Sequence, residues 1–178
     1  MGTQSDFLVS LSESTGQVDF EAVYRLELPR IYNFFRYRLG DDQTAEDLTA
    51  ETFEKAWRHR ERYRDDLASF STWLFTIARR VATDHFRKRR LTLPLDEAEG
   101  ISHPQTLEDT AQERTEFAQL SVLLARLAER ERELVALKYG AGLTNRAIAR
   151  ISGLSESNVS TILSRVTHQL RTQLEDEP

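Results

Sequence analysis

The strongest chemical signal in the sequence is a cluster of cationic side chains between residues 79 and 90. Six of these twelve residues are basic: Arg79, Arg80, Arg87, Lys88, Arg89 and Arg90. Such groups neutralise phosphates and release the counterions that condense on nucleic acids. The macrodipole also favours cations at the C-terminal end of a helix, but six exceed what that simpler role requires. The cluster therefore predicts contact with a nucleic acid.

Aromatic residues lie among and before these cations. Exposed rings can stack on bases that have left a duplex. Large aromatic side chains at helical spacing usually face inward, however, so we expect Trp73, Phe75 and Phe86 to belong to the core rather than to a stacking surface.

A second group of polar side chains occupies one face of a predicted helix near the C-terminus. Its members are Ser157, Asn158, Ser160, Thr161, Ser164, Arg165 and His168. Short hydrogen-bonding groups with one arginine suit contacts with phosphates and base edges. A merely solvated helix face explains the same residues about equally well.

A third group is acidic and follows residue 45. Glu46, Asp47, Glu51 and Glu54 share the outer face of a short amphipathic helix. A catalytic pair of carboxylates needs a cleft and a tuned pKa, and such a helix supplies neither. This acidic face is either a solvated stripe or a docking surface for a basic partner.

Composition narrows the remaining possibilities. The 178 residues include no cysteine and four histidines, which excludes thiolate catalysis and thiolate metal sites. We find no glycine-rich phosphate loop and no nucleophile beside a base, so we expect no catalytic residue, metal or cofactor. No stretch approaches the roughly 20 apolar residues that span a bilayer, so we expect a cytoplasmic protein without a membrane anchor. The net charge of −5 is unevenly distributed and does not argue against nucleic acid.

Helical periodicity positions all three groups. Apolar residues recur at helical spacing from Phe20, with Asp19 as the expected N-cap, and Pro29 is expected to kink or divide this segment. Gly40 and the two residues after it predict a turn before the acidic helix. A loop over residues 63–71 then precedes the helix that carries the cations.

The helical period disappears from residue 91 to about residue 111, where acids, Pro94 and Pro104 dominate. A structureless stretch of this length is uncommon inside a compact domain. Beyond it, Thr144 is expected to cap a short helix, Gly153 to end it, and Ser155 to cap a longer one. This is the pattern of a helix-turn-helix.

These patterns predict an all-α chain of two small helical domains joined by an acidic flexible linker. The expected boundaries are a flexible tail over 1–18, an N-terminal domain over 19–90, the linker over 91–115 and a C-terminal helix-turn-helix domain over 116–174.

The three groups, in this order, resemble the extracytoplasmic-function class of the bacterial sigma factor family. The pattern Glu-Asp-Leu-x-x-Glu-x-Phe-x-x-Ala-Trp at 46–57 is similar to its polymerase-binding helix. The pattern Phe-x-x-Trp-Leu-x-x-Ile-Ala-Arg at 70–79 is similar to its minus-ten helix. Residues 127–139 and 148–156 resemble the domain that reads the minus-thirty-five element. The resemblance covers about residues 19–174.

This resemblance implies a non-enzymatic initiation factor that works as a monomer within the polymerase holoenzyme and both recognises and melts promoter DNA. Its implied partners are promoter DNA, the clamp helices of the largest polymerase subunit, the flap of the second subunit, and an anti-sigma factor or other regulatory protein. The residues implied to bind polymerase are Glu46, Asp47, Leu48, Glu51, Phe53 and Glu54. Those implied at the minus-ten element are Tyr63, Phe70, Arg79, Arg80, Asp84, His85, Arg87 and Lys88. Those implied at the minus-thirty-five element are Arg146, Ser157, Asn158, Ser160, Thr161, Arg165 and His168.

Some residues depart from the family pattern. Ser160 and Ile162 stand where family members usually carry basic residues, which predicts weak contact with minus-thirty-five DNA. Ile162 is more simply explained as part of a wider core stripe. Arg80 replaces a frequent asparagine, so the minus-ten sequence is open. Thr44 precedes the acidic helix, where its simplest role is an N-cap, although a phosphate there would add charge beside Glu46.

Two other classes of protein fit parts of the pattern. A stand-alone helix-turn-helix regulator would need a dimerisation element, and the sequence contains no heptad seam. A purely protein-binding helical module, such as a protein that sequesters a sigma factor, leaves the basic cluster without a role.

Overall fold

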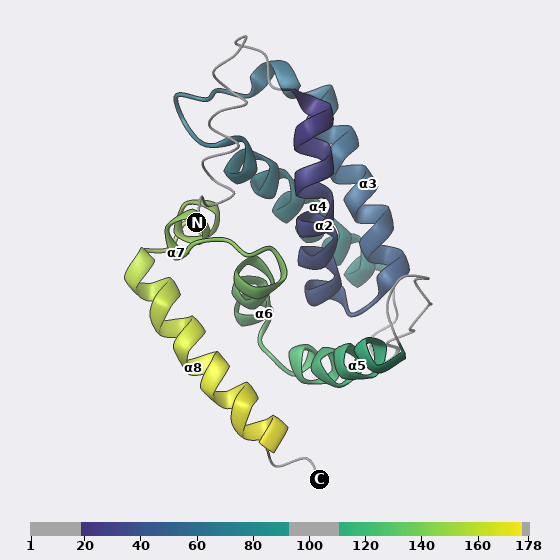
Figure 1. Ribbon diagram of the computed structural model, residues 1–178, viewed down its shortest axis with the longest axis vertical. Helices are drawn as coiled ribbons and strands as arrows, with labels where there is room; N and C mark the ends of the chain where they lie inside the picture. The colour runs from purple at the N-terminus through teal and green to yellow at the C-terminus, as the bar shows by residue number, and fades with distance from the viewer. Residues whose placement is uncertain (1–18, 93–110, 176–178) are drawn as a thin grey trace.

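The computed structural model describes residues 19–92 and 111–175, and within these two ranges every regular element is helical (Figure 1). We call residues 19–92 the N-terminal half and residues 111–175 the C-terminal half. In chain order the elements are α2 (Phe20–Leu39), α3 (Asp42–Arg58), the 3₁₀ turn η1 (Arg60–Arg62), α4 (Phe70–Thr92), α5 (Ala111–Ala125), α6 (Glu129–Val135), the π-helical turn η2 (Ala136–Gly140), α7 (Asn145–Ser152) and α8 (Glu156–Glu175).

Local capping sets the ends of the first two helices. The Asp19 carboxylate accepts hydrogen bonds from two backbone N–H groups in the first turn of α2, as expected. Gly40 ends α2 in the left-handed conformation, with φ of 68°. The cap of α3 is Asp41, whose carboxylate accepts hydrogen bonds from the backbone N–H and the hydroxyl of Thr44. Thr44 thus lies inside α3, and the expectation that it caps this helix is wrong.

Pro29 does not divide α2, so the division of this segment, one of the two outcomes expected from the sequence, does not occur. The helix runs unbroken from Phe20 to Leu39 with Pro29 inside it. A proline inside a helix costs ~3 kcal/mol because it removes a hydrogen bond and crowds the preceding turn. Val23 before it and Ile31 and Phe34 after it are buried on one face, and their packing offsets that cost.

The helices reach further into the predicted linker than expected. α4 continues to Thr92 and α5 begins at Ala111, so both enter the range 91–115. The expected acidic linker otherwise falls on residues 93–110, and the expected tail on residues 1–18; both lie outside the described residues.

The N-terminal half is a bundle in which α2 packs against α3 and α4 (Figure 1). Its interior is largely aromatic. Phe34 and Phe75 meet edge to face with their ring centroids 6.0 Å apart, and both rings are fully buried. This arrangement is common for buried aromatic pairs because the ring edge is positive and the ring face negative.

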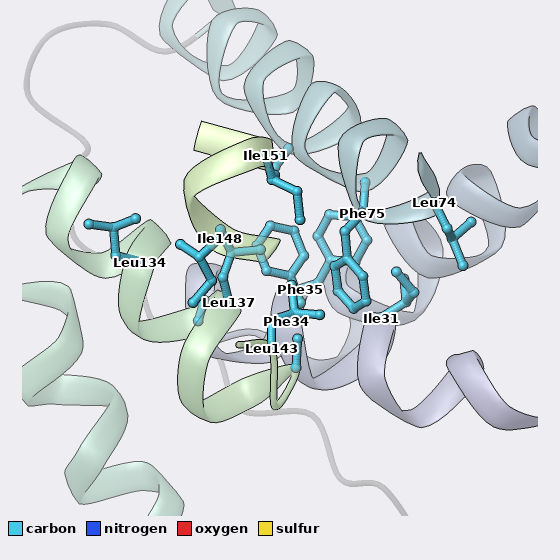
Figure 2. Close-up of a cluster of buried hydrophobic side chains, with 14 of the residues drawn as sticks. Ile31, Phe34, Phe35, Leu74, Phe75, Leu134, Leu137, Leu143, Ile148 and Ile151 are labelled. Atoms are coloured by element: carbon cyan, nitrogen blue, oxygen red, sulfur yellow. The ribbon is translucent and has the colours of Figure 1, made fainter. Parts of the chain in front are cut away.

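The C-terminal half does not stand apart from this bundle. Figure 2 shows Phe34, Phe35 and Phe75 of the N-terminal half beside Ile148 and Ile151 of α7. All five side chains belong to one continuous cluster of buried apolar residues that includes both halves. The two small domains predicted from the sequence therefore share a core in this structure.

The backbones also approach closely where η2 crosses α2. A Cβ atom placed on Gly140 would lie 2.9 Å from the carbonyl oxygen of Asn33 and 3.2 Å from Cγ of Tyr37. Only glycine fits this crossing without a shift of one helix. Within the described ranges, none of the helices is long and apolar enough to cross a membrane.

Candidate nucleic-acid interface

The exposed cations of α4 form the first part of the candidate interface. Arg80, Arg87 and Lys88 are exposed along the second half of the helix. Nη2 of Arg87 lies 3.1 Å from the carboxylate of Asp84, one turn earlier. Arg80 makes no ion pair with any described residue, so its guanidinium is open to a phosphate.

Arg79 is placed differently from its neighbour. Its Nε donates to the Glu133 carboxylate at 2.8 Å, and Glu133 belongs to α6 in the C-terminal half. At the end of the basic cluster, Nη2 of Arg90 lies 2.9 Å from the carboxylate of Glu129, which is on α6 like Glu133. Arg79 and Arg90 therefore pair with carboxylates of the C-terminal half, whereas Arg80 and Arg87 do not.

His85 is half-buried on α4, with its ring centroid 5.8 Å from that of Phe86. Burial lowers the pKa of the His85 imidazole, and the cationic Arg89 one turn away lowers it further. Both effects favour the neutral ring, which can accept as well as donate a hydrogen bond.

An aromatic cluster lies at the beginning of α4. The Tyr63 ring centroid is 5.1 Å from that of Phe70 and 5.5 Å from that of Trp73. Phe70 is only 7% exposed, so its ring supports the loop and offers little surface to DNA. Tyr63 is half-buried, and burial raises the pKa of its hydroxyl, so it stays a donor at neutral pH.

The acidic residues of α3 separate into exposed and paired groups. Glu46 and Asp47 are exposed and form no ion pair with a described residue. Glu51 pairs with Lys55 at 2.7 Å, and Glu54 pairs with Arg58, both one helical turn later. Leaving Glu46 and Asp47 unpaired places negative charge on the first turns of α3.

Two other residues expected to bind a partner on α3 are buried. Leu48 and Phe53 are each 6% exposed and belong to the apolar core. Phe53 also meets Tyr24 of α2 with ring centroids 4.6 Å apart. In this structure these two side chains hold α3 in place and present almost no surface, because they lie on the face opposite the exposed acids.

The helix-turn-helix forms as the caps predict. The Thr144 hydroxyl accepts from the backbone N–H of Ala147, Gly153 has a φ of 74°, and the Ser155 hydroxyl accepts from the backbone N–H of Asn158. The polar residues predicted on the second helix, α8, are exposed: Ser157, Asn158, Ser160, Thr161, Ser164, Arg165 and His168. Val159, Leu163 and Val166 face the core, as expected.

The two arginines of this helix-turn-helix that were expected to bind DNA, Arg146 and Arg165, both lie near carboxylates. Nη2 of Arg165 lies 2.6 Å from the carboxylate of Glu131 on α6. Arg146 is exposed and lies 3.8 Å from the carboxylate of Glu156. Ile162 is partly buried against the core, which agrees with its explanation as an apolar packing residue. The outer face of α8 is thus polar, and the one arginine predicted on it to bind DNA is held by a carboxylate of α6.

Sequence reasoning missed Arg38 and Glu133, which the structure buries together. They are 2% and 6% exposed, and Nη1 of Arg38 lies 2.9 Å from the Glu133 carboxylate. Arg38 occurs in a helix rich in arginines, and Glu133 in a run of alternating Glu and Arg. Composition marks both as surface residues, so no local signal identifies them. In the part of the chain that the structure describes, no group of His, Cys, Asp and Glu side chains is arranged to hold a metal ion.

Comparison with known protein families gives two matches. The family model of sigma-70 region 2 matches residues 23–92, and that of sigma-70 region 4 matches residues 123–172. The two matched segments correspond to most of the two described halves.

Individual relatives agree with these matches. The ECF RNA polymerase sigma factor BldN of Streptomyces coelicolor is 32% identical over 166 residues, which cover 91% of this chain and 63% of BldN. The chain thus spans less than two thirds of that relative. The ECF RNA polymerase sigma factor SigM of Bacillus subtilis is 26% identical over 152 residues, covering 85% of this chain and 92% of SigM.

Solved structures share the fold. The sigma factor RpoE of Bartonella quintana, in complex with the anti-sigma factor NepR, matches with a TM-score of 0.71 and 25% identity over 90% of this chain and 99% of that chain. CnrH, in complex with the cytosolic domain of CnrY, matches with a TM-score of 0.70 and 20% identity over 97% of each chain.

Proposed function

Because this chain belongs to the extracytoplasmic-function class of the sigma-70 family, we propose that it binds core RNA polymerase and directs transcription initiation at specific promoters. The observation that carries this proposal is the separation of charge in the N-terminal half. Unpaired acids lie on α3, and exposed cations lie on α4. One half can therefore meet a basic protein surface and a nucleic acid with different helices.

The polymerase contact is assigned to the exposed acids of α3. Glu46 and Asp47 can bind a partner without breaking an internal ion pair. Glu51 and Glu54 must first give up their ion pairs with a lysine and an arginine of α3. Charge complementarity of this kind raises the rate of encounter and fixes the orientation of docking. Leu48 and Phe53 contribute by holding the helix.

The minus-ten contact is assigned to α4 and the loop before it. Arg80, Arg87 and Lys88 would bind phosphates, while Asp84 and His85 supply hydrogen-bonding groups between them. Tyr63 is the ring best placed to meet an unpaired base, since Phe70 and Trp73 support it from behind. A base that leaves the duplex costs a few kcal/mol of stacking, which such contacts must offset.

The minus-thirty-five contact is assigned to the exposed face of α8 together with Arg146. With Arg165 held by Glu131, this face offers mainly hydroxyl and amide groups. We propose that its share of promoter affinity is small. Because RpoE of Bartonella quintana is bound by an anti-sigma factor, we also propose that a regulatory protein of that class binds this chain.

The test is run-off transcription with core RNA polymerase and genomic DNA, with and without the full-length chain, and with start sites mapped across the genome. We expect a set of start sites that depends on the added chain and shares a common upstream sequence. The same reaction with Asp47→Lys should lose these start sites. A wild-type reaction without any dependent start site would exclude the proposed function.

A further inference from the structure

A second run of arginines lies between α3 and α4, outside the contacts assigned so far. Its members follow Trp57 closely: Arg58, Arg60, Arg62 and Arg64. The first of them pairs with Glu54 and the last with Asp66. Arg60 and Arg62 are exposed and form no ion pair with any residue that the structure describes. These two guanidinium groups therefore carry charge that no internal carboxylate neutralises.

The guanidinium of Arg60 is held in one place beside an aromatic ring. Its Cζ lies 4.2 Å from the centroid of the Trp57 ring, and its Nη1 donates to the backbone carbonyl oxygen of Trp57 at 2.9 Å. That bond uses one of the five N–H groups of an arginine, so the others remain for a ligand. A guanidinium that is already fixed loses little conformational freedom when it binds an anion.

Trp57 is the most exposed tryptophan or phenylalanine ring among those of the described core and its surroundings, with 51% of its surface open to water. The Phe20 ring of α2 meets it edge to face, with the centroids 4.9 Å apart. Figure 1 shows the start of α2 beside the end of α3, where this contact is made. A large flat apolar surface thus lies next to a fixed cation.

The Trp57 ring is also connected to Tyr63, the ring assigned to an unpaired base. From Trp57 the network of ring contacts passes through Phe20 to Phe70, whose centroids are 5.9 Å apart, and from Phe70 to Tyr63 at 5.1 Å. Along the chain the same two outer rings are joined by η1, which carries Arg60 and Arg62. The two exposed cations and the two outer rings therefore belong to one end of the N-terminal half.

We propose that Trp57, Arg60 and Arg62 form a second contact for single-stranded DNA, which holds nucleotides of the non-template strand next to the unpaired base at Tyr63. This inference rests on the proposed function, since it takes Tyr63 as a contact for promoter DNA. Proteins bind single strands with cations along the phosphates and rings on which bases stack. Such contacts tolerate any base, so this surface would stabilise the melted strand without reading its sequence.

The charge of α3 distinguishes this surface from the polymerase-docking acids. Glu46 and Asp47 are in the first turns of the helix, whereas Arg60 and Arg62 follow its last turn. The 17 residues of α3 make a helix about 25 Å long, and salt screens exposed charges beyond roughly 10 Å. A basic protein surface that meets the acids would be repelled by the arginines, while the phosphates of a DNA strand would be attracted.

The test uses holoenzyme assembled from core polymerase and the full-length chain, with a promoter found by the run-off experiment. One DNA fragment carries mismatches that keep its minus-ten region unpaired. The other is fully paired and is measured at a temperature at which it stays closed. Fluorescence anisotropy gives the dissociation constant of each fragment, and urea unfolding of the chain checks that each variant is folded.

Trp57→Leu should weaken binding of the unpaired fragment by at least about fivefold, because it removes a ring on which a base stacks. Binding of the paired fragment should stay nearly unchanged. Trp57→Phe keeps a ring and should retain most of the binding. The control is Tyr24→Leu, which removes an exposed ring of α2 that lies one turn after Phe20 and packs on Phe53. Tyr24→Leu should bind both fragments like the wild type.

Arg60→Gln and Arg62→Gln test the cations and remain informative if Trp57→Leu loses stability. Each should reduce the slope of log affinity against log salt for the unpaired fragment by about 0.7, the value for one phosphate contact on a single strand. Arg126→Gln is the control. Arg126 is an exposed arginine of the C-terminal half that forms no ion pair within the described ranges, and its loss should leave the slope unchanged.

The position of the strand is measured with 2-aminopurine, an adenine analogue whose fluorescence falls when it stacks on a ring. It replaces one base at a time in the unpaired non-template strand. We expect a position next to the base assigned to Tyr63 at which wild-type holoenzyme quenches the fluorescence and Trp57→Leu restores it.

Three results would overturn the proposal. Binding of the unpaired fragment could be unchanged in Trp57→Leu and in both arginine variants. The losses could be equal for the paired and unpaired fragments, which would indicate a general effect on DNA binding. Finally, Trp57→Leu could weaken binding to core polymerase as much as binding to DNA, which would assign the ring to the polymerase.

Failure of the proposed function is distinguishable from these results, because it would appear as an absence of start sites in the run-off reaction. Binding of the full-length chain alone to an oligothymidine strand needs no promoter. Trp57→Leu, Arg60→Gln and Arg62→Gln should each weaken that binding as well, and wild-type affinity in all three would also overturn the proposal.

Discussion

The carboxylate of Glu27 is fully buried in α2 and lies 2.8 Å from Nη1 of Arg30, one turn later. The same guanidinium donates from Nε to the backbone of Ala141 in the C-terminal half and from Nη1 to the hydroxyl of Ser71. Burial raises the pKa of Glu27 above its usual 4.5, although Arg30 and Ser71 act in the opposite direction. The ion pair with Arg30 therefore stabilises the charged form of Glu27 by less than burial destabilises it.

A pH dependence of stability follows from this shift. Between pH 4.5 and the raised pKa, folded chains retain a proton on Glu27 that unfolded chains have released. The contribution of Glu27 to the free energy of unfolding is thus present below pH 4.5 and is lost as the pH rises through the folded pKa. Urea unfolding measures the free energy of unfolding of the wild type and of Glu27→Gln across this pH interval. As the pH rises, the wild type should lose stability relative to Glu27→Gln.

The control for this experiment is Glu21→Gln, which removes an exposed acid of the same helix that pairs with Arg25. A wild type and Glu27→Gln that follow parallel pH profiles would contradict the assignment.

Arg80 should contribute to promoter binding through a phosphate. Its side chain is exposed and forms no ion pair with the described residues, so DNA binding need not break a contact. Arg80→Ala should weaken binding of the holoenzyme to promoter DNA and reduce the slope of log affinity against log salt by about 0.9. Filter binding over a range of salt concentrations measures both. Arg25→Ala on the exposed face of α2 is the control, and an equal loss of slope there would contradict a specific role for Arg80.

Asp47 should matter for polymerase docking in a way that Leu48 does not. Asp47→Lys reverses an exposed charge, so we expect at least about tenfold weaker binding to core polymerase with unchanged stability. Leu48→Ala removes a buried side chain and should cost ~2–5 kcal/mol of stability. Competition for core polymerase and urea unfolding separate the two effects.

Glu61→Lys, an exposed acid on η1, is the matched control for the charge reversal. If it weakened docking as much as Asp47→Lys, overall charge and not a docking face would explain the result.

Ser160→Lys should strengthen contact with minus-thirty-five DNA. The serine is exposed on α8, so a lysine there can reach a phosphate without disturbing the core. One added phosphate contact raises the salt slope by about 0.9. Ile162 is a poorer site for the same experiment, because its side chain packs against the core and an arginine there would change stability as well.

The comparison uses holoenzyme and a promoter fragment that contains the minus-thirty-five element, with Gln169→Lys on the same helix as the control. Equal gains in the two variants would indicate a general electrostatic effect and contradict the placement of Ser160 against the DNA.

Helix ends could be predicted from the sequence because capping is local. Asp19, Thr144 and Gly153 act on backbone groups within a few residues of themselves, and each does what its type predicts. Pro29 shows the limit of this reasoning. Its local cost is real, but it is outweighed by packing between residues distant in sequence, which no window around Pro29 contains.

The same limit applies to the candidate site. The helical period correctly separates the exposed acids of α3 from its apolar face, on which Leu48 and Phe53, two of the residues that the resemblance implies for polymerase binding, are buried. The period of α7 shows that Ile148 and Ile151 are buried, but not that they meet Phe34 and Phe75. Which apolar faces pair depends on the three-dimensional arrangement, and for that reason the contact between the halves and its buried Glu133 were not predicted.

The pair formed by Arg79 and Glu133 also has a consequence for ionic strength. A free cation releases condensed ions when it meets DNA, whereas Arg79 begins with a carboxylate as its own internal counterion. When a phosphate takes the place of Glu133 beside Arg79, one fixed anion replaces another. The released Glu133 carboxylate then attracts cations from solution. DNA binding that displaces Glu133 from Arg79 should accordingly depend less steeply on salt than the number of arginines suggests.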